Sequence, residues 1–307
     1  MQKMLIVLLF IGCTKAPIPE PEPIVFSNIW SFDSLEFADE FDTVPIYSAD
    51  SIDVLEASGG VQASFDENAV WMINDSGNPP NIYLVSTITG KTIHALALEG
   101  VSNIDWEDVA AYEDQNGQRW LYIADVGDNF ALRDSVTIYT FQEPQWADMD
   151  TTLLLESFSP VALTIENFAY ENGSRDAEAF LVDPLDGAWY VINKRTQNNA
   201  LYKVDRSNGT ANKLGQFSLY LTTAADMRQT HPDTTMIVAR TYDHIVCWKR
   251  HSAETLAAAM ARTPELLPYN HFEAQGESIW IRKDGSYATV SEAKSGLLSR
   301  VAAYPLQ

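Results

Sequence analysis

A β-rich unit recurs along this chain at a spacing of about fifty residues, and this repeat restricts the fold more than any other feature. Five short runs rich in β-branched and aromatic residues are predicted strands, separated by Gly, Pro, Asn and Asp: Val70–Ile73, Trp120–Ile123, Trp189–Ile192, Met236–Ala239 and Tyr287–Val290. An acidic residue precedes each run, and these residues recur at intervals of 51, 71, 48 and 51: Glu56, Glu107, Glu178, Asp226 and Glu277. Helical periodicity is scarce between the strands, so a parallel α/β fold is disfavoured.

Each repeat has the pattern of a hairpin followed by a further strand. A polar residue opens the first strand and a polar or charged residue closes the second, in the pairs Glu56/Asp75, Glu107/Asp125, Glu178/Lys194, Asp226/Arg240 and Glu277/Glu292. A period near fifty in an all-β chain is typical of propeller blades of about four strands. We therefore expect an all-β protein, a β-propeller of five four-stranded blades, or six if residues 24–55 form a further blade.

Three segments do not follow the repeat. Residues 24–55 either supply a closing strand beside residues 299–304 or form a degenerate sixth blade. The longest interval is expected to contain an insertion around residues 146–160. Residues 252–262 have helical spacing, so we expect a short helical insertion there with Ser252 as its N-cap.

The N-terminus is typical of an exported protein. Lys3 precedes an apolar run that ends before Gly12 and Cys13, and the run is too short to span a bilayer. The run and Cys13 resemble a bacterial lipoprotein signal, which implies a signal peptide over residues 1–12 and lipidation of Cys13; an ordinary secretory signal is the alternative. Residues 13–23 form a Pro-rich linker, and residues 24–307 form a single propeller domain. We expect a monomer anchored by lipid in the bacterial cell envelope, facing the periplasm or the cell surface.

Charge and cysteine content exclude several classes of function. The chain has 42 acidic and 20 basic residues, a net charge of −22, so nucleic acid and anionic membrane surfaces are not expected partners. Cys13 and Cys247 are the only cysteines, so lipidation of Cys13 leaves no intramolecular disulfide, and Cys247 is expected to be a buried apolar residue. The histidines lack metal-ligand spacing, and no Gly-x-Ser-x-Gly motif occurs.

Equivalent residues of propeller blades lie in a ring, so the acidic residues at the strand ends should meet at one mouth of the central channel. Such a ring has many carboxylates, no sulfur and almost no imidazole, which favours calcium or magnesium over zinc or copper. Lys194 and Arg240 either hold an oxyanion or balance the charge of the ring. The predicted metal ligands are Glu56, Asp75, Asp105, Glu107, Asp125, Asp128, Asp176, Glu178, Asp226, Glu277 and Glu292.

Short acidic motifs recur in the same order as the blades: residues 74–77 (NDSG), 105–108 (DWED), 124–129 (ADVGDN), 176–179 (DAEA) and 275–277 (QGE). This ordered set resembles the blades of secreted bacterial propellers of the phytase-like group. The resemblance implies calcium at the channel mouth, a metal-activated water that attacks phosphorus, and Lys194 and Arg240 as binding residues for a phosphate ester. By the same resemblance, the predicted catalytic residues and calcium ligands are Glu107, Asp125, Glu178 and Glu277.

Two functional hypotheses follow. The first is a calcium-dependent phosphoesterase or related hydrolase that acts on a small anionic substrate. The second is a non-catalytic binding or scaffold lipoprotein that recognises a glycan or a protein partner, because propellers support both roles. At residues 74–77 and 127–129 a structural alternative also applies, since Asp and Asn commonly form turns by bonding the local backbone.

Overall fold

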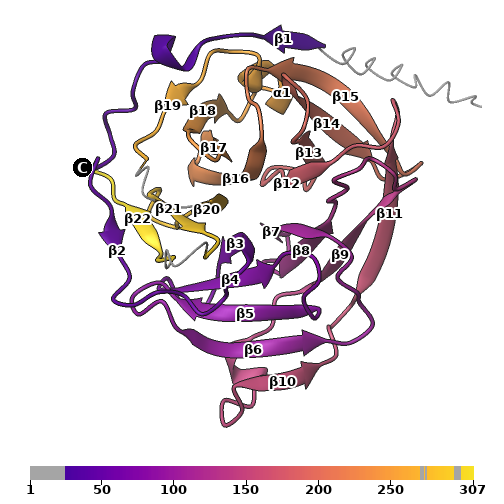
Figure 1. Ribbon diagram of the computed structural model, residues 1–307, viewed down its shortest axis with the longest axis vertical. Helices are drawn as coiled ribbons and strands as arrows, with labels where there is room; N and C mark the ends of the chain where they lie inside the picture. The colour runs from indigo at the N-terminus through magenta and orange to yellow at the C-terminus, as the bar shows by residue number, and fades with distance from the viewer. Residues whose placement is uncertain (1–24, 270–272, 274, 294–298) are drawn as a thin grey trace, which may run out of the picture.

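The strands form five blades around one central axis in the computed structural model, which describes residues 25–269, 273, 275–293 and 299–307 (Figure 1). The innermost strand of each blade contacts the innermost strands of both neighbouring blades, so the ring is closed. These innermost strands are β3 (Ala57–Gln62), β7 (Trp106–Glu113), β12 (Ala177–Val182), β16 (Thr222–His231) and β20 (Gly276–Ile281). The all-β propeller prediction is confirmed, with five blades.

The first two blades are four-stranded antiparallel meanders, and an inserted segment adds a further strand to blade 1. Blade 1 continues from β3 through β4 (Ala69–Asn74), β5 (Asn81–Ser86) and β6 (Thr92–Leu98). Blade 2 continues from β7 through β8 (Arg119–Asp125), β9 (Val136–Gln142) and β11 (Thr164–Tyr170). The predicted insertion contains a 3₁₀ turn, Trp146–Asp148, and β10 (Leu155–Phe158), which pairs in parallel with the outer edge of β6 (Figure 1).

The remaining blades use the same order of strands. Blade 3 continues from β12 through β13 (Trp189–Asn193), β14 (Asn199–Asp205) and β15 (Thr210–Phe217), with β1 (Phe26–Asn28) parallel to β15. Blade 4 continues through β17 (Thr234–Thr241), β18 (Ile245–His251) and β19 (Glu265–Leu266). Blade 5 continues through β21 (Tyr287–Ser291) and β22 (Ala302–Tyr304).

The N-terminal part of the chain closes the ring. Strand β2 (Ile46–Tyr47) pairs antiparallel with β22 and becomes the outer strand of blade 5, so blade 5 contains both early and late residues (Figure 1). Of the two alternatives for residues 24–55, the closing strand is therefore confirmed. A 3₁₀ turn at Phe32–Ser34 precedes it.

The hydrophobic core is divided among the blade interfaces. Five clusters of buried apolar side chains occur, one between each pair of neighbouring blades. The second strands contribute indoles to these layers, and both Trp71 of β4 and Trp189 of β13 are at most 1% exposed. Burial on both faces explains why these strands are nearly continuous apolar runs in the sequence.

The predicted helix is shorter than expected and begins later. Helix α1 (Leu256–Met260) lies between β18 and β19, and Thr255 is its N-cap, with the Thr255 side chain accepting a hydrogen bond from Ala258 N. The prediction that Ser252 caps the helix was wrong, because Ser252 lies in the preceding turn, where its backbone N–H bonds Asp233 O at 2.9 Å. Within the described ranges no helix is long and apolar enough to cross a bilayer.

Candidate functional site

Every innermost strand has a β-bulge near its beginning, at the same end of the propeller axis. Two residues of the inner strand oppose one residue of the second strand at each bulge. A bulge leaves its extra residue outside the regular ladder and redirects that side chain. The bulged residues are Ser58, Glu107, Glu178, Thr223 and Glu277. Blades 2, 3 and 5 therefore place a glutamate at equivalent positions.

Glu107 lies at the centre of an acidic cluster. Single carboxylate oxygens of Asp75, Asp105 and Glu107 lie within 4.8 Å of one another, and the same is true of Glu107, Asp176 and Glu178. Only 4% of Glu107 is exposed. Gly127 packs directly against it, since a Cβ at that position would lie 2.3 Å from Glu107 Oε1 and 2.4 Å from Asp105 Cγ. A side chain at residue 127 would push the carboxylates apart.

Lys194 and Arg195 balance the charge of the group formed by Glu107, Asp176 and Glu178. Lys194 Nζ contacts Glu178 Oε2, and both side chains are 5% exposed. Arg195 Nε lies 2.5 Å from Asp176 Oδ2, while Asp128 N donates to Asp176 Oδ1 at 2.9 Å. Arg195 was not among the predicted site residues, although it directly follows Lys194 in the sequence.

The group formed by Asp75, Asp105 and Glu107 has no cation paired with it among the residues that the structure describes. No Lys or Arg there forms an ion pair with Asp75, Asp105 or Glu107. Ser58 Oγ donates a hydrogen bond to the Glu107 carboxylate, at a long distance of 3.4 Å to Oε2. Burial, reinforced by Glu178, raises the pKa of Glu107 well above its usual range. Burial and the charge of Asp75 raise the pKa of Asp105 to about 6. Both shifts mean that ionisation here is costly without a cation.

Blade 5 adds two carboxylates to the same mouth. Gln275 Nε2 donates to Glu277 Oε1 at 2.7 Å and to Glu292 Oε2 at 2.8 Å. Burial, with the charge of Glu277, raises the pKa of Glu292 to about 7. Burial alone would lower the pKa of Lys194, but the carboxylates of Glu178 and Glu277 outweigh it and raise that pKa.

Asp125 and Asp128 stabilise the loop that follows β8. Asp125 Oδ2 accepts a hydrogen bond from Ile104 N at 3.0 Å, and Asp125 Oδ1 lies 2.7 Å from Arg133 Nη1. Asp128 accepts hydrogen bonds from Leu132 N and Arg133 N, each at 2.8 Å. The Asp128 contacts match the turn-forming alternative for residues 127–129, and each oxygen of both carboxylates already has a partner in the protein.

Glu56 lies at the edge of the mouth rather than in the cluster. It is exposed, and its Oε2 accepts a hydrogen bond from Asn78 Nδ2 at 2.5 Å.

The predicted pair Asp226/Arg240 does not join the acidic cluster. Asp226 is opposite Val238, whereas Arg240 is opposite Ala224, so the two residues are not partners. Asp226 Oδ2 instead accepts a hydrogen bond from Ile281 N of blade 5 at 2.7 Å. This bond joins two inner strands, as does the bond from Phe180 N to Asp108 Oδ2 at 3.0 Å.

Arg240 is fully buried and is a structural residue. Its Nη1 donates to Ser278 O at 2.9 Å and its Nη2 donates to Glu273 Oε2 at 3.1 Å. A Cβ on Gly276 would lie 1.5 Å from Arg240 Nη2, so the guanidinium fills the space beside that glycine. The predicted oxyanion-binding role does not fit a guanidinium in this position.

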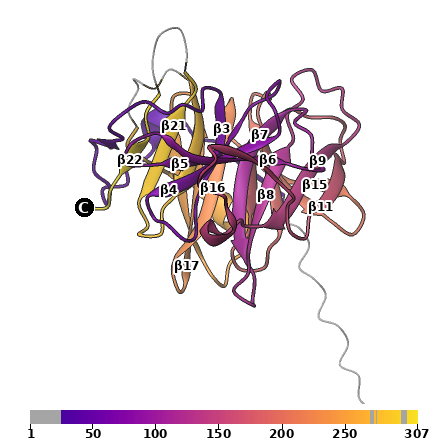
Figure 2. The same cartoon turned by 90° about the horizontal axis from the view of Figure 1, so that it is seen from below.

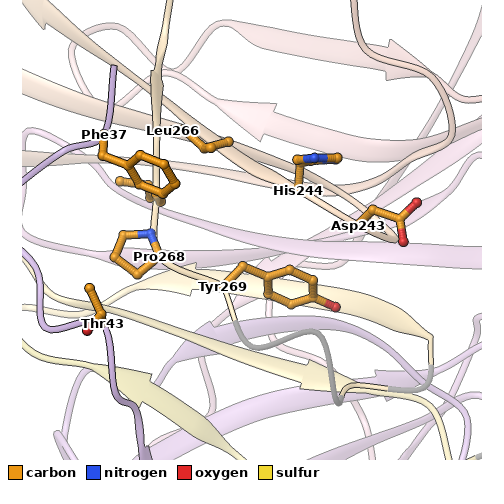
Figure 3. Close-up of a pocket in the computed structure, with 8 residues that line it drawn as sticks. Phe37, Thr43, Asp243, His244, Leu266, Pro268 and Tyr269 are labelled. Carbon is orange, nitrogen blue, oxygen red and sulfur yellow. The ribbon is translucent and has the colours of Figure 1, made fainter. Parts of the chain in front are cut away.

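A separate cavity of about 250 Å³ lies between the N-terminal segment, blade 4 and the residues that follow β19. Phe37, Leu266, Pro268 and Tyr269 give it a largely apolar wall, and Asp243 and His244 lie on its other side (Figure 3). None of the carboxylates of the acidic cluster lines this cavity. It is therefore distinct from the channel mouth.

The comparisons with known proteins bear on the fold. No protein-family model and no curated protein matches this chain. The exo-β-1,3-galactanase of Phanerochaete chrysosporium, solved with galactose, has a TM-score of 0.51 at 12% identity over 86% of this chain and 64% of that chain. Hydrazine synthase of Kuenenia stuttgartiensis has a TM-score of 0.37 at 14% identity, covering 80% and 58% of the two chains.

A third similar structure is the β-propeller domain of Cps50 (Swd1) from Myceliophteria thermophila, with a TM-score of 0.34 at 11% identity, covering 60% and 50% of the two chains. For the galactanase, the part that matches this chain is just under two thirds of its length. At such identities the galactanase likeness concerns the fold alone. The chain is a β-propeller protein with an acidic cluster at one mouth of its channel.

The raised pKa values predict how stability depends on pH. Asp105 and Glu292 have folded-state pKa values of about 6 and about 7, above the usual carboxyl range. The folded state therefore binds protons more tightly than the unfolded state, and the stabilisation is lost as pH rises through these values. In EDTA, we expect the melting temperature to fall between pH 4 and about pH 8. Calorimetry across this range, repeated with Asp105→Asn to reduce the fall, checks the prediction; a rising melting temperature would contradict it.

Proposed function

We propose that this propeller is a calcium-dependent hydrolase that acts on a phosphate ester at its acidic mouth. The observation that carries the proposal is the state of Glu107. Glu107 is only 4% exposed, its carboxylate belongs to both carboxylate groups, and it accepts one long hydrogen bond from the described residues. A side chain in this state stabilises the folded protein only when a proton or a cation neutralises it.

The donor set fits a hard divalent cation. Asp75, Asp105 and Glu107 offer only carboxylate oxygens, the ligands that calcium prefers, and no thiolate or imidazole lies in either group. These three residues would hold the ion, because Lys194 and Arg195 already compensate the other group. When bound, calcium supplies a Lewis acid and lowers the pKa of a water molecule.

Protein side chains would supply the remaining functions. The Arg195 side chain is 47% exposed, so its guanidinium can bind a phosphate oxygen from the solvent side while Asp176 holds its Nε. Lys194 lies deeper, beside the Glu178 carboxylate, and adds positive charge behind the bound anion. Glu292 has a pKa of about 7, so it can accept a proton from water at neutral pH.

The proposal includes the cellular setting and the resemblance to phytase-like propellers. We infer that the protein is an exported lipoprotein of the bacterial cell envelope. Residues 1–12, Cys13 and the whole linker over residues 13–23 lie outside the described residues. The alternative remains a non-catalytic propeller that binds a glycan or a protein. In that case calcium would stabilise the ring without supporting hydrolysis.

The experiment that tests the proposal is the melting temperature of the purified protein in EDTA and in millimolar calcium, followed by assay with p-nitrophenyl phosphate. A ligand that binds only the folded state at a hundredfold excess over Kd adds about 2.7 kcal/mol of stability. We expect a rise of several degrees and calcium-dependent release of nitrophenol. Sodium chloride at matched ionic strength is the control. The metal site is contradicted if calcium, magnesium and manganese all leave the melting temperature unchanged, whereas a rise without hydrolysis supports the binding alternative.

A further inference from the structure

Two large apolar side chains are exposed on the loop that follows β8. Phe130 is 83% exposed and Leu132 is 78% exposed, the highest values among the large apolar residues of the described chain. Single exposed apolar residues are common on proteins and carry little meaning alone. Here, however, the two lie one residue apart on a loop that starts at the acidic cluster.

The loop is held in a defined conformation rather than left free. Asp128 accepts backbone hydrogen bonds from Leu132 and Arg133 through its carboxylate and from Ala131 through its carbonyl, all at 2.8 Å. Ala131 has φ of +51°, a left-handed conformation that a non-glycine residue adopts only at a cost in energy. The protein therefore stabilises a strained turn whose tip presents Phe130 and Leu132 to solvent.

The loop contacts the acidic cluster at Gly127 and the half-exposed guanidinium of Arg195 at Asn129. Gly127 packs against Glu107 and Asp105, as described above. The residue before Phe130 is Asn129, whose Oδ1 accepts a hydrogen bond from Arg195 Nη2. An exposed guanidinium and an exposed apolar pair thus lie at neighbouring positions of one rim.

Other exposed apolar side chains occupy the same end of the axis. Leu55 and Ile104 are each 58% exposed and lie just before inner strands β3 and β7. Tyr220 is 56% exposed and lies just before inner strand β16, next to Leu221, whose N donates to Lys194 O at 3.1 Å. Because inner strands begin and second strands end at one end of the propeller, all of these residues lie at the end of the axis that carries the acidic cluster. We call Leu55, Ile104, Phe130, Leu132 and Tyr220 the apolar rim.

We propose that the apolar rim binds the hydrocarbon part of the substrate, and that the substrate is therefore a phosphate ester with an aryl or alkyl group rather than a highly charged polyol phosphate. This inference rests on the proposed function for the position of the phosphate. Arg195 binds the anionic group, and Phe130 and Leu132 cover the apolar group beside it. A substrate with many phosphates would bind poorly, because the carboxylates of the mouth repel its charges and the apolar rim offers it no polar partners.

Calorimetric titration with two non-hydrolysable probes tests the inference in millimolar calcium. Phenylphosphonate and methylphosphonate share a headgroup and differ in apolar area, so we expect phenylphosphonate to bind about tenfold more tightly. In the double variant Phe130→Ser/Leu132→Ser, the ratio of the two Kd values should fall to about one, with the methylphosphonate Kd unchanged. Ile88→Ser is the matched control, because Ile88 is 59% exposed on the β5–β6 turn and not at the mouth. It should retain the tenfold ratio.

The outcomes separate this inference from the proposed function. If both probes bind the wild-type protein equally, or if the double variant keeps the tenfold ratio, the rim does not bind the substrate and the hydrolase proposal stands. If neither probe binds, the anion site itself is wrong and the inference falls with it. A rim that covers a second copy of the chain would appear as a dimer in sedimentation that the double variant dissociates, with both Kd values unchanged, and would overturn the inference.

Discussion

Replacing Glu107 with Gln is expected to raise the melting temperature in EDTA and to abolish the rise that calcium produces. The substitution removes a buried charge whose pKa burial and the neighbouring Glu178 hold well above the usual range, so the metal-free protein should become more stable. The same change removes a ligand from the Asp75, Asp105 and Glu107 group. The substitution should thus raise the melting temperature in EDTA and lower it in calcium. This pair of effects is expected of a metal ligand whose buried charge destabilises the metal-free protein.

Activity should fall together with calcium binding. Changing residues that merely support metal ligands costs 10- to 100-fold in affinity or activity, so loss of a ligand should reduce kcat/KM by about a hundredfold or more. Glu67→Gln is the matched control, since Glu67 is an exposed glutamate on the β3–β4 turn. A Glu107→Gln protein that keeps the full calcium-dependent rise would show that the ion binds elsewhere, and equal effects of the two variants would show that only net charge matters.

Replacing Asp183 with Asn is expected to lower the free energy of unfolding by about 3 kcal/mol, because the change breaks a buried ion pair. Arg250 Nη1 lies 2.5 Å from Asp183 Oδ2, and Arg250 Nη2 lies 2.7 Å from Asp183 Oδ1. The side chains are 2% and 5% exposed, and the pair joins the β12–β13 turn of blade 3 to β18 of blade 4. Without the carboxylate, the buried guanidinium has no charge partner, and the melting temperature should fall by several degrees.

An exposed ion pair is the control for this prediction. Arg206 Nη2 lies 2.6 Å from Glu166 Oε2, but the side chains are 48% and 31% exposed, so Glu166→Gln should cost less than about 1 kcal/mol. Urea titrations of both variants measure the difference. The combined change of Asp183→Leu with Arg250→Met should recover part of the loss, because apolar residues replace both buried charges. Equal costs for Asp183→Asn and Glu166→Gln would contradict the assignment, and neither variant should alter the calcium response.

The repeat in the sequence was sufficient to predict the fold. The five predicted second strands all lie within β4, β8, β13, β17 and β21, because apolar runs between turn residues are a local property that burial on both faces requires. Spacing also predicted the equivalence of Glu107, Glu178 and Glu277, which the structure places on bulges of three inner strands. Their roles as metal ligands or catalytic residues stay predictions.

Spacing failed where register decides the partner. Asp226 and Arg240 are separated by a distance similar to that of the other pairs, yet the bulge of blade 4 falls at Thr223 and places Asp226 further along the strand. Backbone hydrogen bonding sets this offset, and the residue count does not record it. Arg195 was missed for a related reason, since its contacts with Asp176 and Asn129 come from residues 19 and 66 positions away.

The amino-acid sequence by itself determined the all-β class, the propeller and the crowding of acidic residues at strand ends, because each depends on patterns within one repeat. Only the tertiary structure decided which carboxylates face each other, which are matched by Lys194 and Arg195, and which, like Glu107, are left without a cation among the described residues. The pKa of a carboxyl group depends on its burial and on charges a few ångströms away. Those distances exist only after the ring of five blades closes and brings residues from different repeats together (Figure 1; Figure 2 gives the same ring from the side).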